Sequence, residues 1–76
     1  MKIIQKFVGQ LSVGDTVVLK EYQACKWHDR ECKVELVEFF TSGEFECATL
    51  EFTFPCGMVK TQTWYQAETI RVVEAA

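Results

Sequence analysis

Apolar and polar residues alternate along two runs in the middle of the chain, one on each side of the triplet Thr41-Ser42-Gly43. Val, Phe, Leu and Thr are frequent in both runs, and these residue types favour β-strands. A small polar triplet that ends in glycine indicates a hairpin turn, because glycine readily takes the left-handed conformation that such turns need. We therefore predict that residues 32–54 form one long β-hairpin and that the rest of the chain packs around it.

A three-residue loop at positions 41–43 defines a register for this hairpin. It places Leu36 opposite Ala48 and Val34 opposite Leu50, so that one face is apolar and turns toward the core. A two-residue loop of serine and glycine would shift the pairing by one position and set glutamates opposite apolar residues on both faces. The pattern therefore favours the three-residue loop.

The expected register leaves one unfavourable pair near the turn. Glu38 lies opposite Glu46, and like charges directly opposite each other are destabilising. Val37, Phe39 and Phe40 also interrupt strict alternation in this region. We therefore expect the tip of the hairpin to twist or to stand clear of the core.

The other strands are predicted to be shorter. Strand-forming composition marks residues 2–8, 16–20, 59–65 and 70–74. Residues 21–31 show neither helical nor strand periodicity, so we expect a long irregular loop there, and such loops in small domains are often functional. Residues 66–69 are too few for a stable α-helix and suit a single 3₁₀ turn.

Two runs of residues carry a resemblance to a known architecture. In residues 13–19, Gly14-Asp15 leads into a strand, and in residues 64–73 a one-turn connection leads into a short last strand. Over about residues 11–74 the chain resembles the SH3-like small β-barrels. The resemblance implies an all-β, SH3-like small barrel of five to six short antiparallel strands, with a long first loop and a 3₁₀ turn before the last strand. Residues 1–8 would then be an extra strand that covers an open edge or pairs with a second copy, which makes a homodimer possible in this scheme.

Length and charge restrict the classes of function. The 76 residues, 49% of them hydrophobic, suffice for one small domain covering residues 1–76. No run reaches the roughly 18 apolar residues of a membrane span, and Gln5 and Lys6 interrupt the start before an export signal can form, so we expect a cytoplasmic protein without a membrane partner.

Residues 31–54 carry six carboxylates against Lys33 alone, within a formal net charge of −3. This acidic hairpin opposes nucleic-acid binding and favours a basic partner, although a solvated strand face also explains the charge.

The best candidate for a metal site combines Cys25, His28 and Cys32. Thiolate and imidazole ligands suit zinc, but a fourth ligand would have to come from Cys47 or Cys56, and no C-x₂-C pair is present. We therefore prefer a loop histidine beside ordinary thiols and expect neither a metal nor another cofactor. A cysteine–histidine nucleophile is disfavoured as well, because no third group is placed to orient the histidine.

Aromatic residues provide the binding-site hypothesis. Tyr22 and Trp27 lie in the expected long loop, and Trp64 and Tyr65 end the penultimate strand, regions that line the ligand groove in the SH3-like domains that the chain resembles. Aromatic walls beside carboxylates can hold cationic or proline-containing segments. We expect Tyr22, Trp27 and Trp64 to form such a groove and Tyr65 to fill the core. The expected function is a non-enzymatic protein-interaction or adaptor module with a basic or proline-containing partner.

The alternative is a small-molecule-binding or enzymatic oligomer whose site forms between subunits. Gly14-Asp15, Tyr65 and Ile70 are placed as in the plasmid-encoded type II dihydrofolate reductases, which are SH3-like barrels with a site at the centre of a tetramer. The functional residues of that family do not carry over, since Thr63 stands where its glutamine would be and Leu19 where its lysine would be. We therefore expect no catalytic residues.

Overall fold

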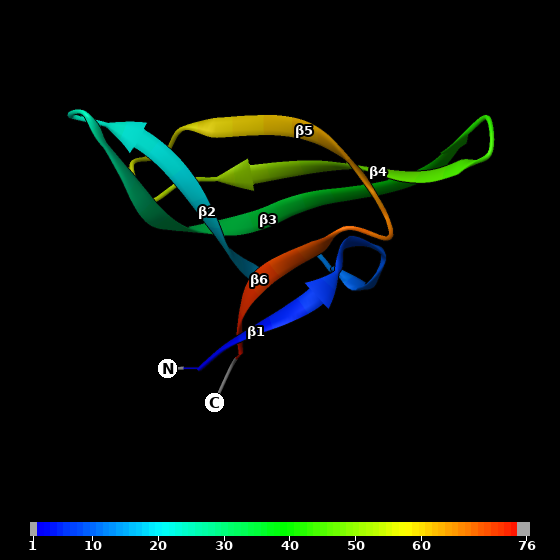
Figure 1. The fold of residues 1–76 in the computed structure, drawn as a ribbon, viewed down its shortest axis with the longest axis horizontal. Coiled ribbons are helices and arrows are strands. Elements are labelled where there is room, and N and C mark those ends of the chain that lie inside the picture. Colours follow the sequence, from blue (N-terminus) through cyan, green and yellow to red (C-terminus); the bar gives the residue numbers. More distant parts are fainter. Residues whose placement is uncertain (1, 75–76) are drawn as a thin grey trace.

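A computed structural model describes residues 2–74 as a single curved antiparallel sheet (Figure 1). The strand order in the sheet is β1-β6-β2-β3-β4-β5. The elements are β1 (Lys2–Phe7), the 3₁₀ helix η1 (Val8–Gln10), β2 (Thr16–Gln23), β3 (Lys26–Ser42), β4 (Phe45–Thr53), β5 (Val59–Tyr65) and β6 (Thr69–Glu74). The prediction of an all-β fold is confirmed. Over residues 2–74 the sheet is not closed, because β1 and β5 remain its two edges.

The long hairpin forms as β3 and β4, but its predicted register was wrong. Ser42 pairs with Phe45, so the turn consists of Gly43 and Glu44, and Gly43 takes a left-handed φ of 61°. Leu50 lies opposite Val37 rather than Val34. The prediction failed because the turn lies at Gly43 and Glu44 instead of residues 41–43, and because a bulge further along β3 interrupts the alternation.

A β-bulge between Val34 and Leu36 changes the face on which later residues of β3 lie. Val34 is fully buried, and Val37, three positions further on, also packs against the core. Leu36, which was expected to face inward, is only half-buried and lies opposite Glu51. The bulge therefore keeps one face of β3 apolar although the apolar residues are not evenly spaced in the sequence.

The tip of this hairpin extends past the core, as expected (Figure 1). Phe39, Phe40 and Phe45 are 51%, 41% and 59% exposed. The actual register also removes the predicted clash of carboxylates, since threonines lie opposite both Glu38 and Glu46. The tip is thus an arm with aromatic side chains in solvent and no like-charged pair across it.

The predicted long loop at residues 21–31 does not exist. β2 continues to Gln23 and β3 begins at Lys26, which leaves a two-residue turn of Ala24 and Cys25. Both residues are left-handed, with φ of 53° and 62°, as a tight hairpin turn requires. The prediction was wrong because the half-buried face of this hairpin end consists of the polar residues Glu21, His28 and Arg30, so no hydrophobic alternation marks the strands, and no glycine marks the turn.

The first strand pairs within the chain. β1 lies antiparallel to β6, with Lys2 opposite Glu74 and Phe7 opposite Thr69. η1 then turns inward and buries Val8 completely. The extra strand predicted at residues 1–8 therefore lengthens the sheet at the β6 side.

The 3₁₀ turn predicted at residues 66–69 is a hydrogen-bonded turn instead, and the 3₁₀ helix lies at η1. The two segments are joined, because Val8 donates its backbone N–H to the Glu68 carbonyl at 2.8 Å and Gly9 donates to the Gln66 carbonyl at 3.0 Å. The turn at residues 66–68 thus supplies backbone acceptors for the first residues of η1. A Cβ on Gly9 would lie 3.3 Å from the Gln66 side chain, so this junction is closely packed.

The core occupies the concave face of the sheet, which we call the inner face. Its fully buried side chains come mainly from β2, β3 and β4. The core consists of Val8, Leu11, Val17, Cys32, Val34, Ala48, Leu50, Phe52, Phe54, Ile70 and Val72.

The short pairing of β2 with β6 is supplemented on the outer face by two hydrogen bonds, 3.1 and 3.3 Å long, from Arg71 to the Asp29 carboxylate. These bonds lower the pKa of Asp29.

The left-handed turn generates a stability prediction. We expect Cys25→Gly to raise the free energy of unfolding by about 0.5 kcal/mol. Glycine relieves the strain that a side chain causes in a left-handed backbone, and this gain exceeds the loss from the greater conformational entropy of glycine in the unfolded chain. Urea denaturation measures this change. Cys56→Gly is the matched control, since Cys56 is also exposed in a turn but has no positive φ. Equal stabilisation by both substitutions would contradict the prediction.

Candidate functional site

Tyr22 and Trp27 form an exposed aromatic pair near the turn between β2 and β3. They lie opposite each other in the strand register, and their ring centroids are 5.2 Å apart. Tyr22 is 59% exposed and Trp27 is 66% exposed. The structure therefore brings these two predicted residues together on one surface.

Trp64 lies elsewhere, on the inner face. It is half-buried, packs against the core and lines a cleft together with Leu19. Leu19 and Tyr22 are three positions apart on the same strand, so their side chains point to opposite faces. Trp64 consequently does not share a groove with the pair of Tyr22 and Trp27, and the three residues belong to two separate places.

Tyr65 was expected to fill the core, and this was wrong because it is 52% exposed. It lies on the outer face, where its ring centroid is 5.3 Å from that of Phe45. Phe40 and Tyr65 flank the buried Cys47, which is paired with both of them in the sheet. We call Phe40, Phe45 and Tyr65 the distal aromatic patch.

The distal aromatic patch is concave and bordered by acids. A cleft of about 510 Å³ is lined by its three rings and by Glu68, among others. The Glu68 carboxylate accepts a hydrogen bond of 2.9 Å from the backbone N–H of Tyr65, which holds this acid beside the patch. Glu44 and Glu46 line the adjoining surface.

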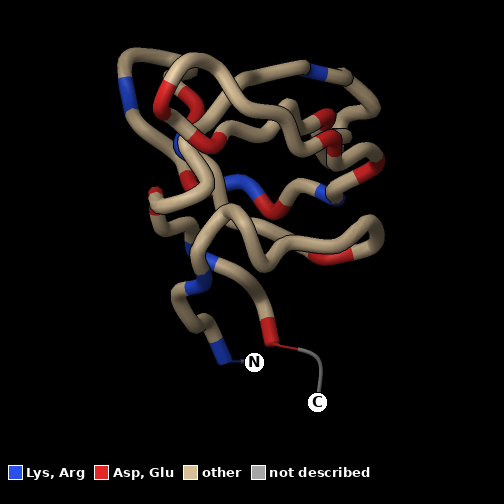
Figure 2. Tube along the Cα trace, turned by 90° about the vertical axis from the view of Figure 1, so that its right-hand side faces the viewer, with Lys and Arg blue, Asp and Glu red and all other residues tan. Residues whose placement is uncertain are grey.

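No basic residue lies on the part of the β3–β4 hairpin that carries Phe40 and Phe45. Between positions 34 and 59 the chain has five carboxylates and neither lysine nor arginine. Figure 2 views the molecule from the side toward which the β3–β4 hairpin extends, and marks basic residues on β1 beside the N-terminus.

Sequence reasoning found the acidic character of the hairpin but missed the distal aromatic patch. The available signal was the pair Phe39-Phe40 at a tip that was expected to stand clear of the core.

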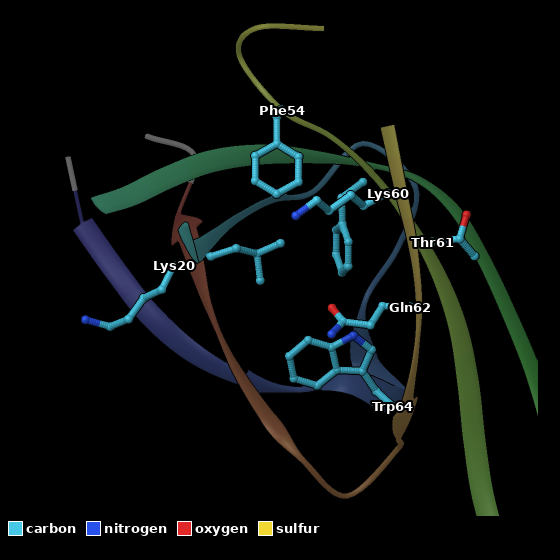
Figure 3. A pocket seen from close by; sticks show the side chains of 8 residues that line it. Lys20, Phe54, Lys60, Thr61, Gln62 and Trp64 are labelled. Atoms are coloured by element: carbon cyan, nitrogen blue, oxygen red, sulfur yellow. The ribbon is translucent and has the colours of Figure 1, made fainter. Parts of the chain in front are cut away.

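A second cleft, which we call the central cleft, opens between β2 and β5 (Figure 3). Its volume is about 420 Å³. Leu19, Phe52 and Phe54 supply its apolar surface, and Gln62 and Trp64 line the β5 side. Two lysines, at positions 20 and 60, complete its border.

The residues of the proposed metal site are not brought together. Cys25 is exposed in its turn, Cys32 is buried, and His28 Nε2 lies 3.0 Å from the carbonyl oxygen of Gln23. Across residues 2–74 no three His, Cys, Asp or Glu side chains are grouped so as to hold a metal ion. Burial raises the pKa of the Cys32 thiol to about 11, with a smaller contribution from the negative charge of Glu21.

The cysteine environments generate a labelling prediction. Thiolates are the reactive form, so the raised pKa keeps Cys32 protonated and unreactive at neutral pH, and burial shields Cys47. We expect iodoacetamide to modify the folded chain at Cys25 and Cys56 only, and at all four cysteines after denaturation. Peptide mass spectrometry identifies the modified positions. Rapid labelling of Cys32 in the folded chain would contradict the prediction.

Comparison with known proteins assigns no family. The chain matches no model of a protein family, no curated protein and no solved structure at a significant level. The part of the chain that the structure describes contains no helix long and apolar enough to cross a membrane. The function must therefore be argued from the geometry and charge of the surfaces described above.

Proposed function

We propose that the chain is a non-enzymatic interaction module that binds a basic segment of a partner protein on the distal aromatic patch. The observation that carries this proposal is the exposure of Phe40 and Phe45 on the hairpin tip, residues 38–46, and of Tyr65 beside it on β5. This tip has three carboxylates and no basic residue. These three exposed rings lie outside the core cluster, so the packing of the core does not require them. A partner that covers them would remove this apolar surface from water.

The chemistry of the patch favours a cation. Aromatic faces attract lysine and arginine side chains, with about 0.5–1 kcal/mol for each exposed contact. The carboxylates of Glu44, Glu46 and Glu68 line the same surface and can accept hydrogen bonds from a guanidinium group. Rings and carboxylates together therefore select a basic segment over an acidic or purely apolar one.

The pair of Tyr22 and Trp27 is a weaker candidate for the same partner. The charges around it are mixed, because Lys20 and Lys26 lie on the same hairpin as Asp29. Lys20 lies 3.9 Å from the Asp29 carboxylate, which already neutralises part of that acid. A basic segment would thus meet repulsion there that the β3–β4 arm does not offer.

The finer description of the fold belongs to the same proposal. The meander of β3, β4 and β5 and the short last strand beside β2 support an SH3-like architecture that is open between β2 and β5. In this description β1 is an addition at the β6 edge. Ligand binding at the ends of strands and in their connections would be in keeping with such a scaffold.

Binding of a fluorescein-labelled peptide of alternating arginine and glycine tests the proposal by fluorescence anisotropy. We expect Phe45→Ala and Tyr65→Ala each to weaken binding about two- to fivefold, because each removes one cation–π contact. Glu68→Gln should weaken binding and reduce its dependence on salt. Circular dichroism checks that each variant is folded.

Trp27→Ala is the matched control, because it removes an exposed aromatic ring from the other hairpin end. We expect it to leave the affinity unchanged. Loss of binding in Trp27→Ala with no effect of Phe45→Ala would move the site to the β2–β3 turn and refute the proposal. Failure of the basic peptide to bind more tightly than a glutamate–glycine peptide would refute it as well.

A further inference from the structure

The central cleft has the size and lining of a small-ligand site, and Trp64 is the one residue that lines both this cleft and the cleft of the distal aromatic patch. Its volume of about 420 Å³ falls within the range of roughly 300–1,000 Å³ that is typical of such sites. Phe52 and Phe54 are buried residues that belong to the core cluster, so the apolar part of the cleft is fixed by the fold. The cleft lies where the sheet is open, between the free edge of β5 and the end of β2 that extends beyond its pairing with β6.

The charge of the cleft is positive. Its lining contains Lys20 and Lys60 and no carboxylate. The nearby Glu21 is engaged elsewhere, because its carboxylate lies 3.3 Å from Arg30. The lining of the cleft therefore includes two lysine residues and no acidic residue.

The two lysines are not equivalent. Figure 3 shows the amino group of Lys60 directed over the cleft beside Phe54, and its nitrogen lies 5.3 Å from the centre of the Phe54 ring. The amino group of Lys20 points away from the cleft, and it lies 3.9 Å from Asp29. Over residues 2–74 no ion pair includes Lys60. Lys60 is thus the cation available to a bound anion.

The β5 side of the cleft contains an unused hydrogen-bond donor. The indole nitrogen of Trp64 is buried and has no hydrogen-bond partner among the described residues. In Figure 3 it lies beside the side-chain amide of Gln62. Because an unpaired buried donor is unfavourable, an acceptor that enters beside Gln62 would be stabilised there.

We infer that the central cleft binds a small amphipathic anion, with its apolar group against Leu19, Phe52 and Phe54 and its carboxylate near Lys60. The apolar surface supplies most of the affinity, since burial of each methylene is favourable. Lys60 supplies the preference for a negative charge. The Gln62 amide, which lies beside the Trp64 indole nitrogen, supplies a polar contact on the β5 side.

Decanoate, decanol and acetate test this inference, because they separate the apolar group from the charge. The measurements use a Trp27→Phe variant, which leaves Trp64 as the single tryptophan, so that its fluorescence emission reports occupation of the cleft. We expect decanoate to bind about three- to fivefold more tightly than decanol, as for a partly exposed ion pair, and acetate to bind far more weakly than either. Isothermal titration calorimetry on the unsubstituted chain measures the same affinities without the fluorescent reporter.

Lys60→Gln should abolish the difference between decanoate and decanol and leave the affinity for decanol unchanged. Lys20→Gln is the matched control at the same cleft, and it should preserve the difference. Equal effects of the two substitutions would overturn the assignment of Lys60. Equal binding of decanoate and decanol to the unsubstituted chain, or no binding of either by fluorescence and calorimetry, would overturn the inference itself.

Discussion

The packing of the middle of β3 against β4 is the constraint on which the rest of the structure depends. β3 is 17 residues long, and it pairs with β2 over its first part and with β4 over its last part. Only its central segment contributes to the core, through Cys32, Val34 and Val37. The bulge after Val34 keeps these side chains on the inner face although their spacing is irregular. Both hairpins are therefore aligned by one short apolar stretch.

A strand longer than the core leaves two ends in solvent, and the exposed aromatic pairs lie there. Tyr22 and Trp27 lie at one hairpin end, and Phe45 lies at the other beside Tyr65 of β5. Rings at these positions add little to the core, and they are free to contact a partner. The opening between β2 and β5 has a different origin, because it follows from the incomplete closure of the sheet. The chain thus offers an acidic surface and a basic cleft that arise from separate features of the fold.

The sequence predicted strands where the residue types favour β-structure, including β5, whose side chains are mostly exposed. The bounds of β5 were predicted at Val59 and Tyr65, and the hairpin of β3 and β4 was recognised from its turn and apolar runs. Its predicted register was wrong because Gly43 begins a two-residue turn instead of ending a three-residue one, and because the bulge at Glu35 has no signature of its own in the sequence. The turn at Ala24-Cys25 was missed since both residues are unusual in left-handed conformations.

The predicted site residues illustrate the same limit. Alternation alone assigns a residue to one of two faces, but the assignment depends on knowing where the strand begins. With residues 21–31 predicted as a loop, the sequence does not place Tyr22 and Trp64 on opposite faces of one sheet. The exposure of Tyr65 depends on which face of β5 turns toward the core, and in the structure the face with Trp64 does so. The acidity of the arm was predictable, because it depends only on composition.

The pairing of β1 with β6 has a practical consequence for work with this chain. Lys2 and Glu74 lie opposite each other, with 3.7 Å between the amino nitrogen and a carboxylate oxygen, and both ends of the described chain emerge on the side away from the β3–β4 tip (Figure 1). A linker or affinity tag fused at either end would therefore start far from the aromatic arm. Tethering to a sensor surface through such a tag would leave that arm directed outward into the flowing sample.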